Sequence, residues 1–318
     1  IGTAPKASFW LLRSEYVLEE NVIEEYNWVS AAEFADSVGA DVINSSLSYK
    51  DFIDYPEWDH AYEDMDGNTA ISTIAADIAA SKGILVWNSS GYDGYDQESW
   101  WIGAPADAYC CLTVGAVNVE SVYAQLSSRG PTADGRFKPT ISSLGAGTYR
   151  AFGVSNFYGP GNGTSYASPI IAGMSACLWQ ANPEMKVVEI IAAIKQSASI
   201  SDNPDNYIGW GIPDYELANQ IMTTLENHIV STESNIKVWP NPFSDKLEIK
   251  FDNNKDSDIQ QLRLVSTTGA VIFNQDIDAK YGENTIELSS KVSGLPSGIY
   301  LLQIISDKSA EVVQILKQ

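Results

Sequence analysis

A serine at the start of a predicted helix is the residue in this sequence best placed for chemistry. Ser165 lies in the run GTSYASP at residues 163–169, and glycines at 159, 161 and 163 let the backbone bend closely around a ligand. The positive end of the helix dipole and the unpaired N–H groups there favour a developing oxyanion, as nucleophilic acyl transfer requires. Taken alone, a serine at this place is more often an N-cap. The run therefore indicates either a nucleophile or an ordinary helix cap.

The first two-thirds of the chain, which must position this serine, alternate strand-like and helix-like segments. Apolar runs predict buried strands at residues 7–13, 41–47, 84–87 and 112–117, and apolar residues at helical spacing predict helices at 28–38, 69–81, 165–180 and 185–197. Strands and helices that alternate with short breaks predict right-handed βαβ units and a mostly parallel sheet covered on both faces. We therefore expect an α/β domain.

After about residue 225 the pattern changes to short alternating strands. They lie at residues 247–251, 262–264, 271–273, 286–288, 300–304 and 312–316, with turn residues between them. This pattern predicts a small all-β sandwich. We expect a first domain at 1–227, a linker at 228–235 and the β-sandwich at 236–318.

The charge of the chain excludes some partners. Of its 318 residues, 19 are Lys or Arg and 41 are Asp or Glu, for a net charge of −22. Residues 1–234 contain 10 basic and 30 acidic residues, so the acidity belongs to the first domain. This charge repels a phosphate backbone, and we expect no nucleic-acid partner. No apolar run approaches the ~18 residues that a membrane-spanning helix needs.

Three cysteines are an odd count and indicate no particular redox compartment. The adjacent Cys110 and Cys111 would close a strained ring, and Cys177 lies in an apolar helical stretch, where we expect a small buried residue. The chain begins with Ile1, and nothing near it resembles a signal peptide, so we expect a processed or truncated chain.

The serine run resembles the nucleophile motif of the subtilisin-like serine peptidases, Gly-Thr-Ser-x-Ala-x-Pro, at every fixed position. Residues 2–7, 41–48, 127–131, 138–139 and 209–211 resemble further landmarks of the family in the family's order. The resemblance covers about residues 1–221 and implies a three-layer subtilisin-like domain without its N-terminal part. It also implies that Ser165 is the nucleophile and that a substrate polypeptide lies beside Ser46, Leu47, Ser48, Gly91, Gly163 and Thr164.

Two departures from the family's pattern concern catalysis. The family's aspartate and histidine motifs do not occur, and neither His60 nor His228 has the family's context, so we expect both to face solvent. Tyr92 stands where the family has the asparagine that donates to the oxyanion, and losing such a donor typically costs about 100- to 1,000-fold in turnover. Either an N-terminal fragment of the same protein supplies the missing groups, or the domain is a degenerate peptidase.

An acidic turn at Asp64, Asp66 and Asn68 presents alternating oxygen atoms, as a calcium loop does. It lacks the glycine position and the bidentate glutamate of an EF-hand. An ordinary acidic turn before a helix is the other interpretation. No zinc pattern and no phosphate-binding loop occur, so we expect that no cofactor is required, and calcium at this turn stays open.

The last domain resembles the C-terminal sorting domain of type IX secretion substrates in Bacteroidota. The matching runs lie at residues 238–243, 262–269, 295–301 and 315–318. A generic carbohydrate-binding or adhesion sandwich is the alternative. The resemblance implies passage through the periplasm, contact of residues 236–318 with the type IX machinery, and a secreted or outer-membrane cell-surface location.

These features together predict a secreted or cell-surface subtilisin-like serine endopeptidase that acts on polypeptides. The alternative is an inactive peptidase-like cargo or surface component with a binding or structural role. Because a serine hydroxyl without a base is a weak nucleophile, we expect these 318 residues alone to hydrolyse nothing.

Overall fold

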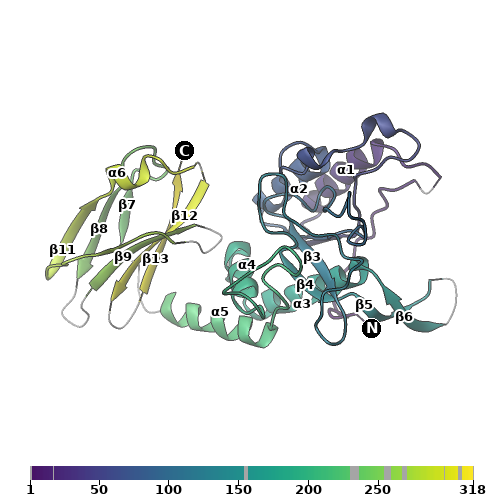
Figure 1. The fold of residues 1–318 in the computed structure, drawn as a ribbon. Helices are drawn as coiled ribbons and strands as arrows, with labels where there is room; N and C mark the ends of the chain where they lie inside the picture. Colours follow the sequence, from purple (N-terminus) through teal and green to yellow (C-terminus); the bar gives the residue numbers. More distant parts are fainter. Residues whose placement is uncertain are drawn as a thin grey trace. The chain divides into compact units, whose positions relative to one another are not determined.

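The computed structural model describes residues 2–16, 18–153, 157–229, 236–253, 259–266, 271–296, 298–306 and 310–317. The chain forms two compact units, Ile1–Asn219 and Gln220–Gln318 (Figure 1). In the described residues, no helix is both long enough and apolar enough to cross a membrane.

A parallel sheet forms the centre of the first unit. Its strands, in spatial order, are β1 (Val42–Ser45), β2 (Leu85–Ser89), β3 (Leu112–Val117) and β4 (Ile141–Leu144), and each neighbouring pair is parallel. β2 and β3 are buried along their whole length, as expected of strands covered on both faces. The predicted parallel sheet is therefore confirmed, with β4 as a strand that the sequence analysis missed.

Helices cover the sheet. α1 (Ile23–Ser37) packs against α2 (Ile71–Ser81), and α2 packs against β2, whereas α3 (Thr164–Ala181) contacts all four strands. Figure 1 shows α1 and α2 above the sheet and α3 below it. The remaining helical elements of the first unit are η1 (Pro56–Trp58), η2 (Tyr62–Asp64) and α4 (Val187–Gln196), and α5 (Tyr215–Ile229) begins in the first unit and ends in the second.

The core between α1, α2 and the sheet follows from side-chain size. Ala75, Ala76 and Ala79 form the buried face of α2, and their small side chains let the helix lie close to the sheet. Trp28 of α1 fills the space beside them and donates from its Nε1 to Ser45 Oγ at 3.1 Å. This packing anchors the end of β1, where the predicted substrate strand begins.

Residues 7–13, predicted as a buried strand, form no strand in the structure. Phe9 is 72% exposed and Leu11 is 91% exposed. β1 is an edge strand, and no described strand pairs with its outer edge or with residues 7–13. A strand needs a neighbour for its backbone N–H and C=O groups, which explains why this prediction was wrong.

The predicted burial of Cys177 was also wrong. Cys177 is exposed, and its Sγ lies 3.5 Å from the backbone oxygen of Thr3. The buried residues of α3 include Ser175 and Leu178, which belong to the helix face that packs against the sheet. Position 177 lies outside that face. Cys110 is exposed, Cys111 is buried, and neither forms a disulfide in the described chain.

A β-hairpin that the sequence analysis did not predict leads from the sheet to α3. Its two antiparallel strands are β5 (Ala146–Ala151) and β6 (Tyr158–Asn162). One residue separates β4 from β5, and one residue separates β6 from α3. Its exposed side chains include Tyr149, Phe157 and Tyr158. The glycines of β6 obscured the strand pattern in the sequence.

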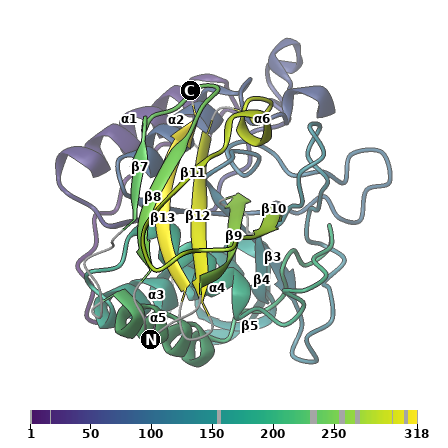
Figure 2. The same ribbon diagram turned by 90° about the vertical axis from the view of Figure 1, so that its left-hand side faces the viewer.

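The second unit is a sandwich of two antiparallel sheets. One sheet has the order β10 (Val271–Asp276), β9 (Ile259–Ser266), β12 (Gly298–Ser306) and β13 (Ala310–Lys317), and the other has β11 (Gly282–Glu287), β8 (Glu248–Asn253) and β7 (Lys237–Trp239). A short helix, α6 (Ser289–Val292), follows β11. Figure 2 shows strands of both sheets running in nearly the same direction.

Side chains from both sheets form the core of this unit. The fully buried members include Leu247, Ile249, Leu262, Leu264, Leu302 and Ile315. Buried residues alternate with half-buried or exposed ones along β8, β9 and β12, which is the pattern that predicted the sandwich, and the structure confirms it.

Candidate active site

The predicted nucleophile lies where the sequence places it, at the start of a helix. Ser165 is the second residue of α3, and Gly163 is its N-cap. The backbone N–H of Gly163 donates to Gly145 O at 2.7 Å, which ties the start of α3 to the end of β4. Ser165 therefore lies in the first helical turn, where backbone N–H groups without helical partners can hold an oxyanion.

A second tie joins α3 to the turn after β2. Thr164 is fully buried, and its Oγ1 accepts from Gly91 N at 3.3 Å and donates to Gly91 O at 3.2 Å. Gly91 has φ +104°, and a Cβ there would lie 2.8 Å from Ser128 Oγ. Both the backbone conformation and the space therefore require glycine at this position.

Tyr92 extends from the same turn to the nucleophile. Its hydroxyl donates a hydrogen bond to Ser165 Oγ, and its side chain stays 51% exposed. The structure therefore brings together the predicted nucleophile and the tyrosine that stands at the family's oxyanion-donor position. In this arrangement the phenol contacts the hydroxyl oxygen of the predicted nucleophile.

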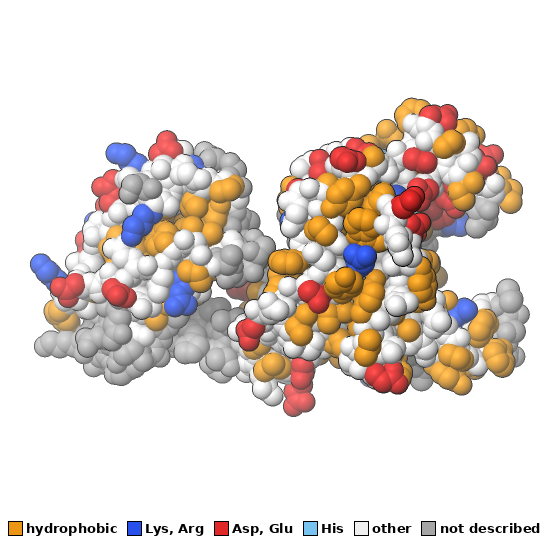
Figure 3. Space-filling model, in the orientation of Figure 1, with side chains coloured by type: hydrophobic (Ala, Val, Ile, Leu, Met, Phe, Trp, Pro, Cys, Tyr) orange, Lys and Arg blue, Asp and Glu red, His pale blue; other side chains and the backbone are white. Residues whose placement is uncertain are grey.

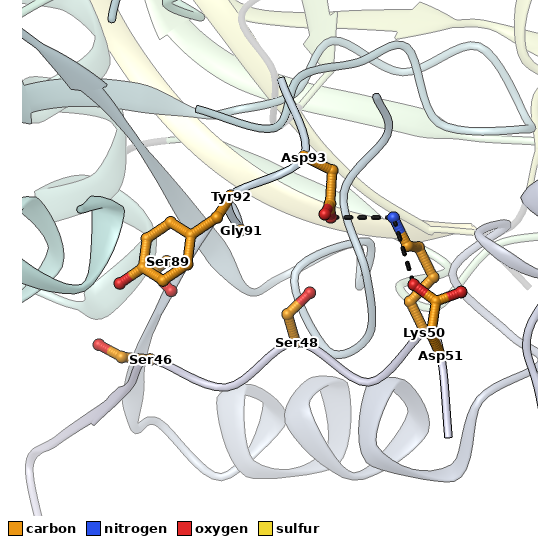
Figure 4. Close-up of a pocket in the computed structure, with 8 residues that line it drawn as sticks. All are labelled: Ser46, Ser48, Lys50, Asp51, Ser89, Gly91, Tyr92 and Asp93. Carbon is orange, nitrogen blue, oxygen red and sulfur yellow. Dashed lines mark ion pairs between the residues drawn. The ribbon is translucent and has the colours of Figure 1, made fainter. Parts of the chain in front are cut away.

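A pocket of about 180 Å³ lies beside Tyr92 (Figure 4). Its lining residues come from the segments after β1 and β2: Ser46, Ser48, Lys50, Asp51, Ser89, Gly91, Tyr92 and Asp93. Three of the predicted substrate-binding residues, Ser46, Ser48 and Gly91, are among them. The others are placed elsewhere: Leu47 packs against the core, and Gly163 and Thr164 lie at the start of α3.

The far end of this pocket carries an ion pair that the sequence analysis missed. Lys50 Nζ lies 2.9 Å from Asp93 Oδ2 and donates to Ser99 O at 3.0 Å and to Ser99 Oγ at 2.8 Å. The Lys50 side chain is 4% exposed and lies over the Trp101 ring, 5.1 Å from its centroid. Figure 4 shows this pair at the opposite end of the pocket from the Tyr92 ring. All three ammonium donors are thus used within the protein.

Replacing this lysine is expected to destabilise the first unit. Lys50→Met leaves Asp93 and two Ser99 acceptors without their donor, and we expect the free energy of unfolding to fall by about 2 kcal/mol. Urea unfolding followed by tryptophan fluorescence measures the change. Lys82→Met, at an exposed lysine, is the matched control. Equal midpoints for the two variants would show that the Lys50 pair contributes no stability.

The expectation that His60 faces solvent was wrong. Its side chain is 14% exposed, and its Nε2 lies 2.6 Å from Glu25 Oε1. Burial alone would lower the pKa of His60, but the hydrogen bond and the charge of Glu25 raise it above its ordinary value. His60 is thus engaged by α1, and the side chain of His228 lies outside the described residues. Neither histidine is shown beside Ser165.

The three residues of the predicted calcium turn have partners within the protein. Asp64 Oδ2 accepts from Ala61 N at 2.8 Å, and Asp66 Oδ1 accepts from Asn68 N and Thr69 N at 2.7 and 2.9 Å. In the part of the chain that the structure describes, no three His, Cys, Asp or Glu side chains are grouped as a metal site requires. These contacts are those of an acidic turn before α2.

Comparison with known families identifies the class of protein that this fold and site define. A model described as the subtilase family matches residues 2–211, more than half of the chain, so the chain belongs to the subtilase family. A model described as the secretion system C-terminal sorting domain matches residues 237–318. This domain marks proteins exported by type IX secretion to the cell surface or the extracellular space. Both predicted resemblances are therefore confirmed.

Curated relatives are similar to the first unit. Subtilisin amylosacchariticus of Bacillus subtilis subsp. amylosacchariticus is 30% identical over 224 residues, which are 69% of this chain and 51% of that protein. The membrane-bound transcription factor site-1 protease of Mus musculus is 30% identical over 203 residues, 62% of this chain and 17% of that protein. The chain thus spans about half the length of the subtilisin that it matches.

Solved structures share the fold at lower identity. The prenylagaramide maturation protease PagA superposes with a TM-score of 0.51 at 20% identity, covering 63% of this chain and 68% of that chain. The PatG macrocyclase in complex with peptide has a TM-score of 0.51 at 18% identity, covering 62% and 57%. These likenesses confirm the subtilisin-like fold.

Proposed function

We propose that this chain is part of a secreted or cell-surface subtilisin-like serine endopeptidase with Ser165 as its nucleophile. The observation that carries the proposal is the position of Ser165 in the first turn of α3, with a pocket next to it beyond Tyr92. Residues 236–318 direct export, joined to the peptidase domain at 1–227 by the linker at 228–235. A polypeptide substrate adds as a strand beside Ser46 and Ser48.

The chemistry is acyl transfer. Ser165 Oγ bonds to the scissile carbonyl carbon while its proton passes to a base, and the carbonyl oxygen becomes an oxyanion held by N–H donors at the start of α3. The base then donates the proton to the leaving amine, and water hydrolyses the acyl-enzyme. Subtilases need no organic cofactor. Calcium binding at Asp64, Asp66 and Asn68 stays a prediction and enters no step.

We infer that an N-terminal fragment of the same protein supplies the base and its orienting aspartate. The outer edge of β1 has no partner strand in the described residues, and the apolar residues 9–12 near the start of the chain are exposed. Trp10 contacts Phe34 of α1, with ring centroids 5.4 Å apart. An added strand would satisfy the open edge of β1 and cover apolar surface.

A covalent probe tests this proposal. The natively purified protein, with intact masses recorded for every chain, is treated with a fluorophosphonate, and we expect a single adduct on Ser165. The adduct should vanish in Ser165→Ala and persist in Ser81→Ala, which changes an exposed serine at the end of α2. No adduct in a preparation whose masses show the N-terminal region present would overturn the peptidase proposal.

An inactive surface or cargo component is the second candidate, and the Tyr92 contact favours it. A phenol that donates to Ser165 Oγ engages one of the two lone pairs of that oxygen and makes it a weaker nucleophile. The same probe experiment decides between the two candidates, because an inactive domain would give no adduct.

A further inference from the structure

An unpaired arginine lies beside the proposed nucleophile. The Arg150 guanidinium, on β5, lies 4.1 Å from the ring centroid of Phe152 and 5.0 Å from that of Tyr166, the residue that follows Ser165. Its Nε is buried and has no hydrogen-bond partner. Among the described residues, no carboxylate lies within ion-pair distance of Arg150. Arg150 as a whole is half-buried, and a buried donor without a partner costs free energy, so the Nε N–H has no compensation in the described residues.

The hairpin is shaped around this side chain. Arg150 pairs with Gly159 across the hairpin, and Gly161 lies nearby on β6. A Cβ at Gly161 would lie 2.5 Å from Arg150 Nε and 3.0 Å from a Tyr166 ring carbon. Any larger residue at position 161 would therefore displace the guanidinium from the Tyr166 ring.

The sheet places Arg150 on the other side of Ser165 from the pocket. The pocket residues follow β1 and β2, whereas the hairpin follows β4 at the other edge of the sheet, and α3 contacts all four strands. A polypeptide with the residue before its scissile bond in the pocket therefore continues past Ser165 toward the hairpin. Apolar side chains gather over this hairpin (Figure 3), and Tyr149, Phe157 and Tyr158 are exposed there.

The chemistry of Arg150 indicates which side chain it would meet. A guanidinium held over aromatic rings presents a fork of donors that matches a carboxylate. Residues 1–234 carry 30 acidic and 10 basic side chains, but charges more than about 8 Å away are largely screened at physiological ionic strength. The nearby cation therefore decides the local preference.

We propose that Arg150 binds the carboxylate of an Asp or Glu within the first two residues after the scissile bond, which makes it a specificity-determining residue for the leaving-group side of the substrate. This inference rests on the proposed function, because it takes Ser165 as the point of cleavage.

The first test compares matched peptides. Pairs that differ by Asp or Asn at the first or second residue after the scissile bond are hydrolysed by the natively purified protein. We expect kcat/KM to favour Asp by about 10- to 100-fold at one of these positions. Arg150→Gln should bring the ratio close to one. Arg129→Gln, at an arginine that also lies over two aromatic rings, should leave it unchanged.

The second test needs no turnover. Fluorescence anisotropy measures how tightly a labelled peptide binds to the Ser165→Ala protein. The peptide extends on both sides of the bond that would be cleaved, and it carries either Asp or Asn after that bond. Tighter binding of the Asp peptide, lost in Arg150→Gln, supports the inference even if the fluorophosphonate gives no adduct. Equal binding of both peptides overturns the inference, and it does so whether or not the probe labels Ser165, so the two proposals fail separately.

Discussion

Tyr92→Asn is expected to raise kcat for peptide hydrolysis by about 100-fold or more. The measurement uses the protein together with the N-terminal fragment that supplies the base for Ser165. The Tyr92 hydroxyl donates to Ser165 Oγ, so it occupies the attacking oxygen rather than the oxyanion. Asparagine removes that hydrogen bond and presents a shorter amide donor from the same turn. Hydrolysis of a fluorogenic peptide at saturating concentration measures the change.

Two further variants make this result interpretable. Tyr92→Phe removes the hydroxyl without supplying a donor, so we expect a gain below about tenfold. Tyr95→Asn changes an exposed tyrosine three residues later and should have no effect. A fall in kcat for both Tyr92→Asn and Tyr92→Phe would contradict the prediction and would make the phenol itself the oxyanion donor.

Glu25→Ala is expected to lower the free energy of unfolding by about 3 kcal/mol or more, because it removes one member of a buried, hydrogen-bonded charge pair. Glu25 is 1% exposed, and besides His60 it accepts from Ser72 N at 3.1 Å and from Ser72 Oγ at 2.7 Å. Urea unfolding should show a lower midpoint at an unchanged slope. Glu33→Ala, on the exposed face of α1, should change the midpoint little. Similar losses for the two variants would contradict this assignment.

The same pair gives stability a defined pH dependence. Burial alone would raise the pKa of Glu25, but hydrogen bonds from His60 and Ser72 lower it below its ordinary 4.5. The pKa of His60 is raised above its ordinary 6.5. The Glu25 contribution is therefore lost as pH falls through its lowered pKa, and that of His60 is lost as pH rises through its raised pKa. We expect the pair to stabilise most between pH 4.5 and 6.5.

Comparing the stability of the native protein and of a His60 variant over a range of pH checks this window. Unfolding free energies of the native protein and of His60→Asn, measured from pH 4 to 9, should differ most near pH 6 and converge as the pH rises. A constant difference across the range would show that the His60 charge contributes nothing to stability.

Local pattern alone was enough for the elements with regular periodicity. The strands at 84–87 and 112–117 were predictable because parallel strands read as short apolar runs, and the helix at 69–81 because its apolar residues recur at helical spacing. The hairpin β5–β6 was not predictable, since its glycine-rich second strand resembles a loop. Residues 7–13 have a strand pattern, but pairing with a neighbour, and not propensity, decides whether a strand forms.

The sequence by itself determined the class of domain, the place of Ser165 at a helix start and the export domain, because those features depend on short motifs and on periodicity. The tertiary structure decided which distant side chains meet. It paired Lys50 with Asp93, His60 with Glu25 and Tyr92 with Ser165, and among the described residues it placed no carboxylate within ion-pair distance of Arg150. Such pairings depend on the path by which long loops return to the sheet. The energy of each pair depends on its burial, and no local sequence pattern encodes either of these.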